Sequence, residues 1–132
     1  MPFNSVFSWF IKKRVHQIEL FQKYPIEVQA ELIQKMIENA ALTNFGLDHG
    51  FISITNVDDF RKAVPVRSYD KLSPYIERLR QGEQGVLWPS KLKWFAKSSG
   101  TTSGNSKFIP VSKEALEDCH FKGGKDLLAL YY

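Results

Sequence analysis

The stretch that decides the fold is a polar loop between two apolar segments. It reads Lys97-Ser98-Ser99-Gly100-Thr101-Thr102-Ser103-Gly104-Asn105-Ser106-Lys107. Residues 92–96 precede it and residues 108–111 follow it, and both flanks are rich in the aromatic and β-branched residues that favour strands. Glycines let backbone N–H groups turn inward, hydroxyls donate hydrogen bonds, and a lysine supplies positive charge. The stretch therefore predicts a strand–loop–strand unit that binds an anion, most naturally a polyphosphate.

Two common glycine motifs do not fit this loop. A Walker A loop ends in Gly-Lys-Ser/Thr, but here Asn105 and Ser106 separate Gly104 from Lys107. The glycine spacing of the dinucleotide fingerprint is also absent. The loop instead resembles the phosphate loop of acyl-adenylate-forming enzymes, Ser-Gly-Thr-Thr-Gly-x-Pro-Lys, with Ser103 as an extra residue and Ser106 in place of the proline. Both departures resemble one branch of that superfamily, the auxin-responsive acyl acid amido synthetases and their bacterial relatives.

Other segments carry the same resemblance, from about Thr43 to the end of the chain and more loosely through the first two predicted helices. They are Val64-Pro65-Val66, Tyr69-Asp70, Pro74-Tyr75-Ile76-Glu77-Arg78, Gly82-Glu83, Leu87-Trp88-Pro89 and residues 107–112. The resemblance implies a mixed α/β fold, in which N-terminal helices lead into the first strands of an acyl-adenylate-forming large domain. Residues 1–132 would be the N-terminal part of that one domain, helical over 1–85 and strand–loop–strand–helix over 86–132, with the remainder missing.

The resemblance also implies an activity and a binding site. The complete protein would use ATP and Mg2+ to convert a carboxylic acid into an acyl-adenylate, and would then conjugate it to an amino acid. By matching positions, the residues expected to bind the ATP phosphates are Ser98, Ser99, Gly100, Thr101, Thr102, Ser103, Gly104, Ser106 and Lys107. Lys107 would stabilise the phosphates during catalysis, whereas Lys97 could equally be a solvated residue at a strand end. The 132 residues alone are expected to be inactive, because the family keeps its remaining nucleotide and acyl contacts downstream.

Composition bounds the alternatives. The chain has 132 residues, 43% hydrophobic, and a net charge of +4 from scattered basic residues, which fits a globular domain and is only a weak sign of nucleic-acid binding. One rival is a non-catalytic nucleotide- or phosphate-binding module. The other is a basic interaction protein that binds nucleic acid or a membrane through a first helix carrying Trp9 and residues 12–14. Neither explains the loop with its flanks as well, so we expect no nucleic-acid and no membrane partner.

Cysteine and histidine usage points away from other chemistry. Cys119 is the only cysteine, so no internal disulfide is possible, and a small buried filler is its expected role. His16, His49 and His120 lack metal-ligand spacing, and no metal site is predicted. Neither a signal peptide nor a run of the ~18–20 apolar residues that span a bilayer is present, which makes a cytoplasmic location the default expectation.

Periodicity predicts the remaining elements. Helices are expected over about 4–23, 55–63, 69–80 and from 112 onward, with a strand near 86–88. A further helix is expected from Pro25, with an apolar stripe that reaches Ala40 and a stop at residues 43–46. Gly46 is expected to end the second helix as a left-handed cap, and Thr55 to open the third through a shortened capping box. Gly123-Gly124 suggests close packing or a break in the last helix. The uncapped apolar run at 127–132 predicts that the chain is the front part of a longer polypeptide.

Overall fold

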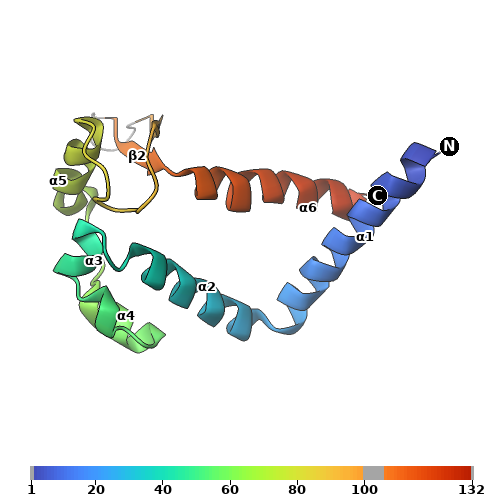
Figure 1. Cartoon of the computed structure of the whole chain (residues 1–132), viewed down its shortest axis with the longest axis horizontal. Coiled ribbons are helices and arrows are strands. Elements are labelled where there is room, and N and C mark those ends of the chain that lie inside the picture. Colours follow the sequence, from blue (N-terminus) through green and yellow to red (C-terminus); the bar gives the residue numbers. More distant parts are fainter. Residues whose placement is uncertain (1, 100–105, 132) are drawn as a thin grey trace. The chain divides into compact units, whose positions relative to one another are not determined.

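The computed structural model describes residues 2–99 and 106–131, and only the backbone of residues 2–8 and 10. These residues combine helices with one pair of strands, which confirms the predicted mixed α/β class. They divide into two compact units (Figure 1). The first contains the residues up to Gln29 and those from Glu114 onward, and the second runs from Ala30 to Lys113.

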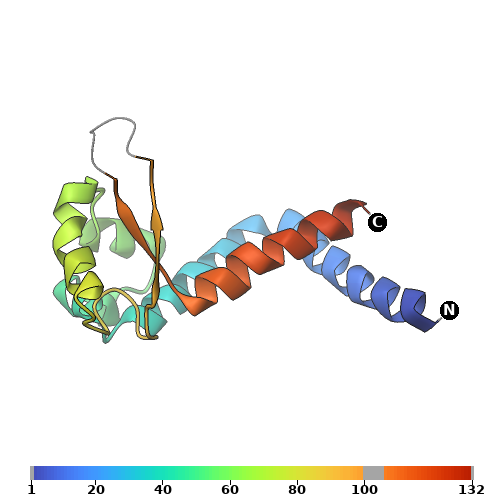
Figure 2. The same cartoon turned by 90° about the horizontal axis from the view of Figure 1, so that it is seen from above.

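The first unit is built on two helices. α1 (Pro2–Lys23) packs against α6 (Lys122–Tyr131), with Ile11 and Ala129 buried, and the two helices meet near the C-terminal end of α6 (Figure 2). Arg14 of α1 donates from Nε and Nη2 to the two carboxylate oxygens of Asp126 on α6, the second bond at 2.7 Å. This bidentate ion pair is the main polar contact between the two helices.

The last helix differs in two ways from the sequence prediction. Between Glu114 and α6 the chain forms a π-helical segment, η2 (Ala115–Phe121), and Cys119 within it is exposed rather than buried. The prediction of a buried filler was therefore wrong, because this face of the segment lies at the surface. Gly123 and Gly124 neither break α6 nor pack closely, since a Cβ atom at either would meet no atom within 4 Å.

The second unit has its own hydrophobic core. It takes in most of α2 (Pro25–Ala40), then α3 (Asn44–Asp48), η1 (Phe51–Ser53), α4 (Val57–Ala63), α5 (Tyr69–Arg80) and the strands β1 (Trp94–Lys97) and β2 (Phe108–Val111). One buried cluster consists of Ile37, Ala40, Phe51 and Ile54, and the other of Leu79, Val86 and Leu92. Trp88 packs against both clusters and so joins them.

The turn between α2 and α3 corrects the prediction for Gly46. Thr43, only 2% exposed, caps α3: its Oγ1 accepts from the Gly46 N–H at 3.0 Å and donates to the Ala40 carbonyl at 2.7 Å. Gly46 therefore lies inside α3 and is not among the glycines with positive φ. Glycine is needed here because a Cβ atom would lie 2.1 Å from the Ala40 oxygen.

Residues 86–88 form an irregular segment, not the predicted strand. Val86 is fully buried, and its carbonyl accepts from the Phe45 N–H at 2.9 Å. The Gly85 carbonyl accepts from the Asn44 N–H at the same distance. The backbone of this apolar run thus satisfies the free N–H groups at the start of α3, and therefore does not join a strand ladder.

The predicted strands around the loop are confirmed. β1 and β2 pair antiparallel, with Trp94 opposite Val111, Phe95 opposite Pro110 and Lys97 opposite Phe108 (Figure 2). β1 begins two residues after the predicted apolar segment does. Pro110 has no N–H, so it occurs in a strand only where no ladder bond is required of it.

The other helices match their predicted ranges closely, with one change of cap. α4 is capped by Asn56, whose side chain accepts from the Asp59 N–H at 2.9 Å, whereas the Thr55 hydroxyl donates to the Asp59 carboxylate. α5 runs from Tyr69 to Arg80 with Pro74 inside it. No helix within residues 2–99 and 106–131 has both the length and the apolar character to cross a membrane.

Candidate phosphate-binding site

The two ends of the hydroxyl-rich stretch meet where β1 and β2 end. The Ser98 N–H donates to the Lys107 carbonyl at 2.9 Å, and the Lys107 N–H donates to the Ser98 hydroxyl oxygen at 3.1 Å. Ser98 and Lys107, nine positions apart in sequence, are therefore held face to face. The Ser98 oxygen serves this closure as an acceptor, and its O–H remains a donor.

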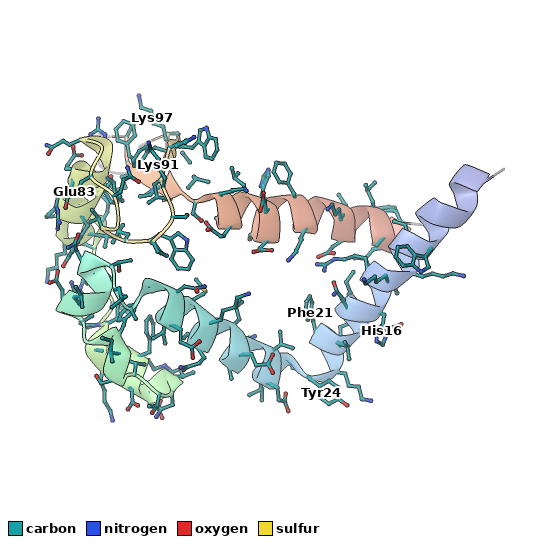
Figure 3. The ribbon with its side chains drawn as sticks, in the orientation of Figure 1. His16, Phe21, Tyr24, Glu83, Lys91 and Lys97 are labelled. Atoms are coloured by element: carbon teal, nitrogen blue, oxygen red, sulfur yellow. The ribbon has the colours of Figure 1, made fainter. Side chains whose placement is uncertain are left out.

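The structure describes four of the nine predicted phosphate-binding residues. Ser98, Ser99, Ser106 and Lys107 lie at the two ends of the stretch, beside the strands. The other five, Gly100, Thr101, Thr102, Ser103 and Gly104, lie outside the described residues. Lys97, the last residue of β1, is exposed and points away from the strands (Figure 3).

Lys107 is exposed and lies over an aromatic ring. Its Nζ is 5.5 Å from the centroid of the Tyr69 ring, a cation–π contact from the first residue of α5. Within residues 2–99 and 106–131 no carboxylate forms an ion pair with Lys107. The ammonium is therefore oriented by a ring and remains available to an anion.

Tyr69 also holds the residue that follows Lys107. Its hydroxyl oxygen accepts from the Phe108 N–H at 2.9 Å and donates to the Phe108 carbonyl at 3.2 Å. The Arg80 guanidinium, at the other end of α5, lies 4.0 Å from the centroid of the Phe108 ring. The sequence carried no signal for these contacts. Tyr69 and Phe108 are 39 positions apart, and the Tyr69-Asp70 pair contributed only to the family resemblance.

α5 is tied to α3 by polar contacts. The Tyr75 hydroxyl donates to Asp48 at 2.7 Å, which raises the pKa of Tyr75. Arg78 donates to Asn44 at 2.9 Å and makes two hydrogen bonds to Glu83, which lower the pKa of Glu83. These bonds join side chains of the same unit, and Arg78 therefore has a structural role.

His49 is a structural residue of the same region. Its Nδ1 lies 2.7 Å from the Phe45 carbonyl oxygen, and its ring stacks on Phe45 at a centroid distance of 4.0 Å. His49 therefore takes part in the packing around the end of α3.

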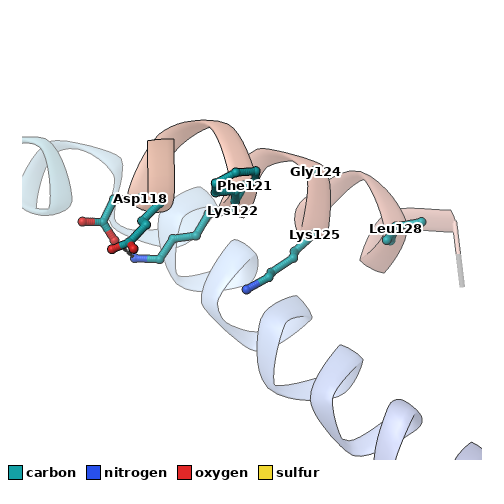
Figure 4. A pocket seen from close by; sticks show the side chains of 7 residues that line it. Asp118, Phe121, Lys122, Gly124, Lys125 and Leu128 are labelled. Atoms are coloured by element: carbon teal, nitrogen blue, oxygen red, sulfur yellow. Dashed lines mark hydrogen bonds and ion pairs between the residues drawn. The ribbon is translucent and has the colours of Figure 1, made fainter. Parts of the chain in front are cut away.

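A hollow of the surface lies on η2 and α6 (Figure 4). It is lined by Glu117, Asp118, Phe121, Lys122, Gly124, Lys125 and Leu128, all from η2 and α6. Asp118 and Lys122 form an ion pair within it. Because one helical segment supplies every lining residue, the hollow is an open strip of surface, and we do not treat it as a binding site.

Comparison with known proteins identifies the family. The family model of the GH3 family N-terminal domain matches residues 14–132. The chain belongs to the GH3 family. This confirms the resemblance inferred from the loop and its flanking segments.

Named relatives of the GH3 chain are amido synthetases. The jasmonoyl–L-amino acid synthetase JAR4 of Nicotiana attenuata is 29% identical over 104 residues, which cover 78% of this chain and 18% of the relative. The indole-3-acetic acid-amido synthetase GH3.8 of Oryza sativa subsp. indica is 32% identical over 109 residues, 82% of this chain and 17% of the relative. The probable indole-3-acetic acid-amido synthetase GH3.1 of Arabidopsis thaliana is 29% identical over 106 residues, 80% of this chain and 18% of the relative. The GH3 chain thus spans less than a fifth of the length of these relatives.

Proposed function

We propose that the GH3 chain supplies the ATP phosphate-binding loop of an acyl acid amido synthetase. The observation that carries the proposal is the closure of the loop, where Ser98 and Lys107 are held face to face inside the segment that matches the GH3 family. The chain would form the N-terminal part of one acyl-adenylate-forming domain. Its relatives include a jasmonoyl–L-amino acid synthetase and an indole-3-acetic acid-amido synthetase, which supports a carboxylic acid and an amino acid as substrates.

The proposed reaction has two steps. In the first, the carboxylate of the acid attacks the α-phosphorus of ATP, an O–P bond forms, and pyrophosphate leaves with the electrons of the broken P–O bond. In the second, the amino acid nitrogen attacks the acyl carbonyl, the C–N bond forms, AMP leaves, and the nitrogen loses its proton. The first step needs no general base, because a carboxylic acid is already ionised at neutral pH.

This chain's residues act on the leaving group. The Lys107 ammonium and the hydroxyls of the loop would bind the β- and γ-phosphates and oppose the charge that develops on pyrophosphate. Such preorganised donors act through positioning and charge stabilisation. Phosphate oxygens are acceptors only, which suits a set of hydroxyl donors and one cation.

The described residues offer hydrogen-bond donors for phosphate oxygens but no cluster of side chains that would enclose Mg2+. Among them there is no group of three or more His, Cys, Asp or Glu side chains that could hold a metal ion. Mg2+ favours phosphate oxygens and retained waters over all-protein cages. We therefore expect Mg2+ to be held by the triphosphate, where it would neutralise phosphate charge, and we assign it no ligand in this stretch.

The test is ATP–pyrophosphate exchange by the longest product of the open reading frame that contains this sequence. A panel of aryl, indolyl and fatty acids would be assayed with and without amino acids. Lys107→Ala should lower acid-dependent exchange by about 100- to 1,000-fold, the range found on removing one oxyanion-hole donor. Lys93→Ala, which removes another exposed lysine just before β1, is the matched control and should leave the exchange unchanged.

The outcomes separate the alternatives. Unchanged exchange in Lys107→Ala would remove this residue from the site. ATP binding without exchange for any acid would favour the non-catalytic phosphate-binding module, and salt-sensitive binding to DNA or anionic vesicles would favour the basic interaction protein. The 132 residues alone should give no exchange, and turnover by them would refute our placing the other substrate contacts elsewhere.

A further inference from the structure

We propose that Tyr69 is the positioning residue of this site: it fixes where the loop enters β2 and thereby where the Lys107 ammonium stands. The inference rests on the proposed function, because it assigns to Tyr69 the ordering of a phosphate-binding lysine. The Tyr69 side chain combines two contacts: its hydroxyl hydrogen-bonds to the Phe108 backbone, and its ring lies beneath the Lys107 ammonium.

The hydroxyl takes the place of a neighbouring strand. Opposed residues of an antiparallel pair alternate between hydrogen-bonded and non-hydrogen-bonded pairs. Ser98 and Lys107 form a hydrogen-bonded pair, so the next pair, Lys97 and Phe108, is a non-hydrogen-bonded one. The N–H and C=O of Phe108 therefore point away from β1, and the single hydroxyl of Tyr69 satisfies both, at 2.9 and 3.2 Å.

The ring acts on the side chain next to that backbone. Lys107 precedes Phe108, and its ammonium lies 5.5 Å from the Tyr69 ring centroid. A flexible lysine loses rotamer freedom when it binds a phosphate, and a ring that already restrains it lowers that loss. The hydroxyl thus fixes the backbone at which Lys107 begins, and the ring limits where its ammonium can go.

Tyr69 can do this because its own base is fixed. It is the half-buried first residue of α5. Ile76 and Leu79 bury the inner face of that helix, at 1% and 3% exposure. The Arg78–Asn44 bond ties the helix to the start of α3. Tyr69 therefore belongs to a packed helix, and a helix fixes the position of a side chain more precisely than a loop does.

The same helix offers a matched control. Tyr75, six residues along α5, also donates its hydroxyl to an acceptor, Asp48 at 2.7 Å, but within residues 2–99 and 106–131 it forms no hydrogen bond with β2 or Lys107. Tyr69→Phe and Tyr75→Phe therefore remove the same atom from the same helix. Only the first change releases the Phe108 backbone.

The experiment compares the two variants in the exchange assay with the complete gene product. Tyr69→Phe should raise the KM for ATP about three- to tenfold, as expected from the loss of one or two hydrogen bonds, and leave the KM for the acid unchanged. Tyr69→Leu, which also removes the ring, should raise it further. Tyr75→Phe should keep both KM values within about twofold of the wild type, whatever its effect on Tm.

A second readout does not depend on turnover. Native-state hydrogen exchange should show faster exchange of the Phe108 amide in Tyr69→Phe and unchanged exchange in Tyr75→Phe. If Lys107→Ala is impaired but Tyr69→Phe has the wild-type KM for ATP, Tyr69 does not position the lysine, and the proposed function stands. If the wild type binds neither ATP nor pyrophosphate, the proposed function is wrong and this inference falls with it.

Discussion

The two units of the chain differ in the interactions that stabilise each of them internally. The second unit buries two apolar clusters, one around Ile37 and Phe51 and one around Val86, and Trp88 joins them. In the first unit the described buried apolar residues are Ile11 and Ala129 alone, and the principal link is the ion pair of Arg14 with Asp126. Several large apolar side chains of the first unit are exposed: Trp9, Leu20, Phe21, Tyr24, Ile26, Phe121, Leu127, Leu128, Leu130 and Tyr131. Phe21 and Tyr24 are labelled in Figure 3.

The difference teaches where the chain's stability should reside. Buried apolar area contributes far more to the free energy of folding than a partly exposed ion pair does. The second unit, which carries the loop, should therefore be the harder one to open, and α1 and α6 the easier ones. Four changes test this contrast.

Gly46→Ala should have the largest effect. Its Cβ would lie 2.1 Å from the Ala40 carbonyl oxygen and 2.9 Å from that of Ala41, both backbone atoms that cannot move aside cheaply. We expect a loss of about 2–4 kcal/mol in the free energy of unfolding, measured by urea denaturation. Gly123→Ala is the matched control in the first unit, where a Cβ meets open space and should stabilise α6 by about 0.5–1 kcal/mol. Equal stability of the two variants would contradict the packing described at Gly46.

Thr43→Ala should come next. It removes the hydroxyl that accepts from the Gly46 N–H and donates to the Ala40 carbonyl, leaving both groups without that partner in a buried turn. The expected loss is about 1–2 kcal/mol, the usual effect of losing a helix cap. Thr43→Ser keeps the hydroxyl and should retain most of the stability in the same thermal melt. A serine variant as unstable as the alanine variant would mean that the methyl group, not the cap, is what matters.

Asp126→Asn should weaken the first unit by about 1 kcal/mol at neutral pH. The Arg14 guanidinium lowers the pKa of Asp126 below its ordinary value. A carboxyl with a lowered folded-state pKa contributes stability that is present above its unfolded pKa, about 3.9, and is lost as the pH falls through the folded value. The gap between wild type and variant should therefore close below about pH 4. Asp58→Asn, which removes the charge of an exposed ion pair with Arg61, is the control. A difference in stability between the wild type and Asp126→Asn that persisted in acid would contradict the role of the Asp126 charge.

Cys119→Ser should have the smallest effect, within about 0.5 kcal/mol, because the side chain is exposed. The folded wild-type protein should react with a thiol reagent at a rate close to that of the denatured chain. Strong protection of the thiol would mean that η2 is covered in solution.

Regular patterns in the sequence predicted the helices and the strands beside the loop. The apolar period from Pro25 to Ala40 predicted α2, because one helix face is set by residues three and four apart, although the stop expected at Gly46 lies inside α3. The enrichment in aromatic and β-branched residues on both sides of the polar stretch likewise placed β1 and β2. These features depend on neighbours in the sequence.

The features that the sequence did not predict depend on distant partners. Val86 belongs to an apolar run that suits a strand or a buried irregular segment equally, and only its bond to Phe45 decides between them. A glycine at position 46 suggests the end of a helix, yet glycine is required there because of the Ala40 carbonyl. At the candidate site the hydroxyls and Lys107 could be named from the motif, whereas the support from Tyr69 arises only when α5 meets β2.

Pro110 limits how this small sheet can grow. It lies in a non-hydrogen-bonded pair with Phe95, so its nitrogen is on the outer edge of β2, where an added strand would need an N–H that proline lacks. The Phe108 groups on the same edge are already taken by Tyr69. A further strand, whether from the same polypeptide or from another molecule, can therefore extend the sheet only beside β1. Pro110 therefore disfavours pairing of another chain with the outer edge of β2 and leaves β1 as the strand beside which the sheet can extend.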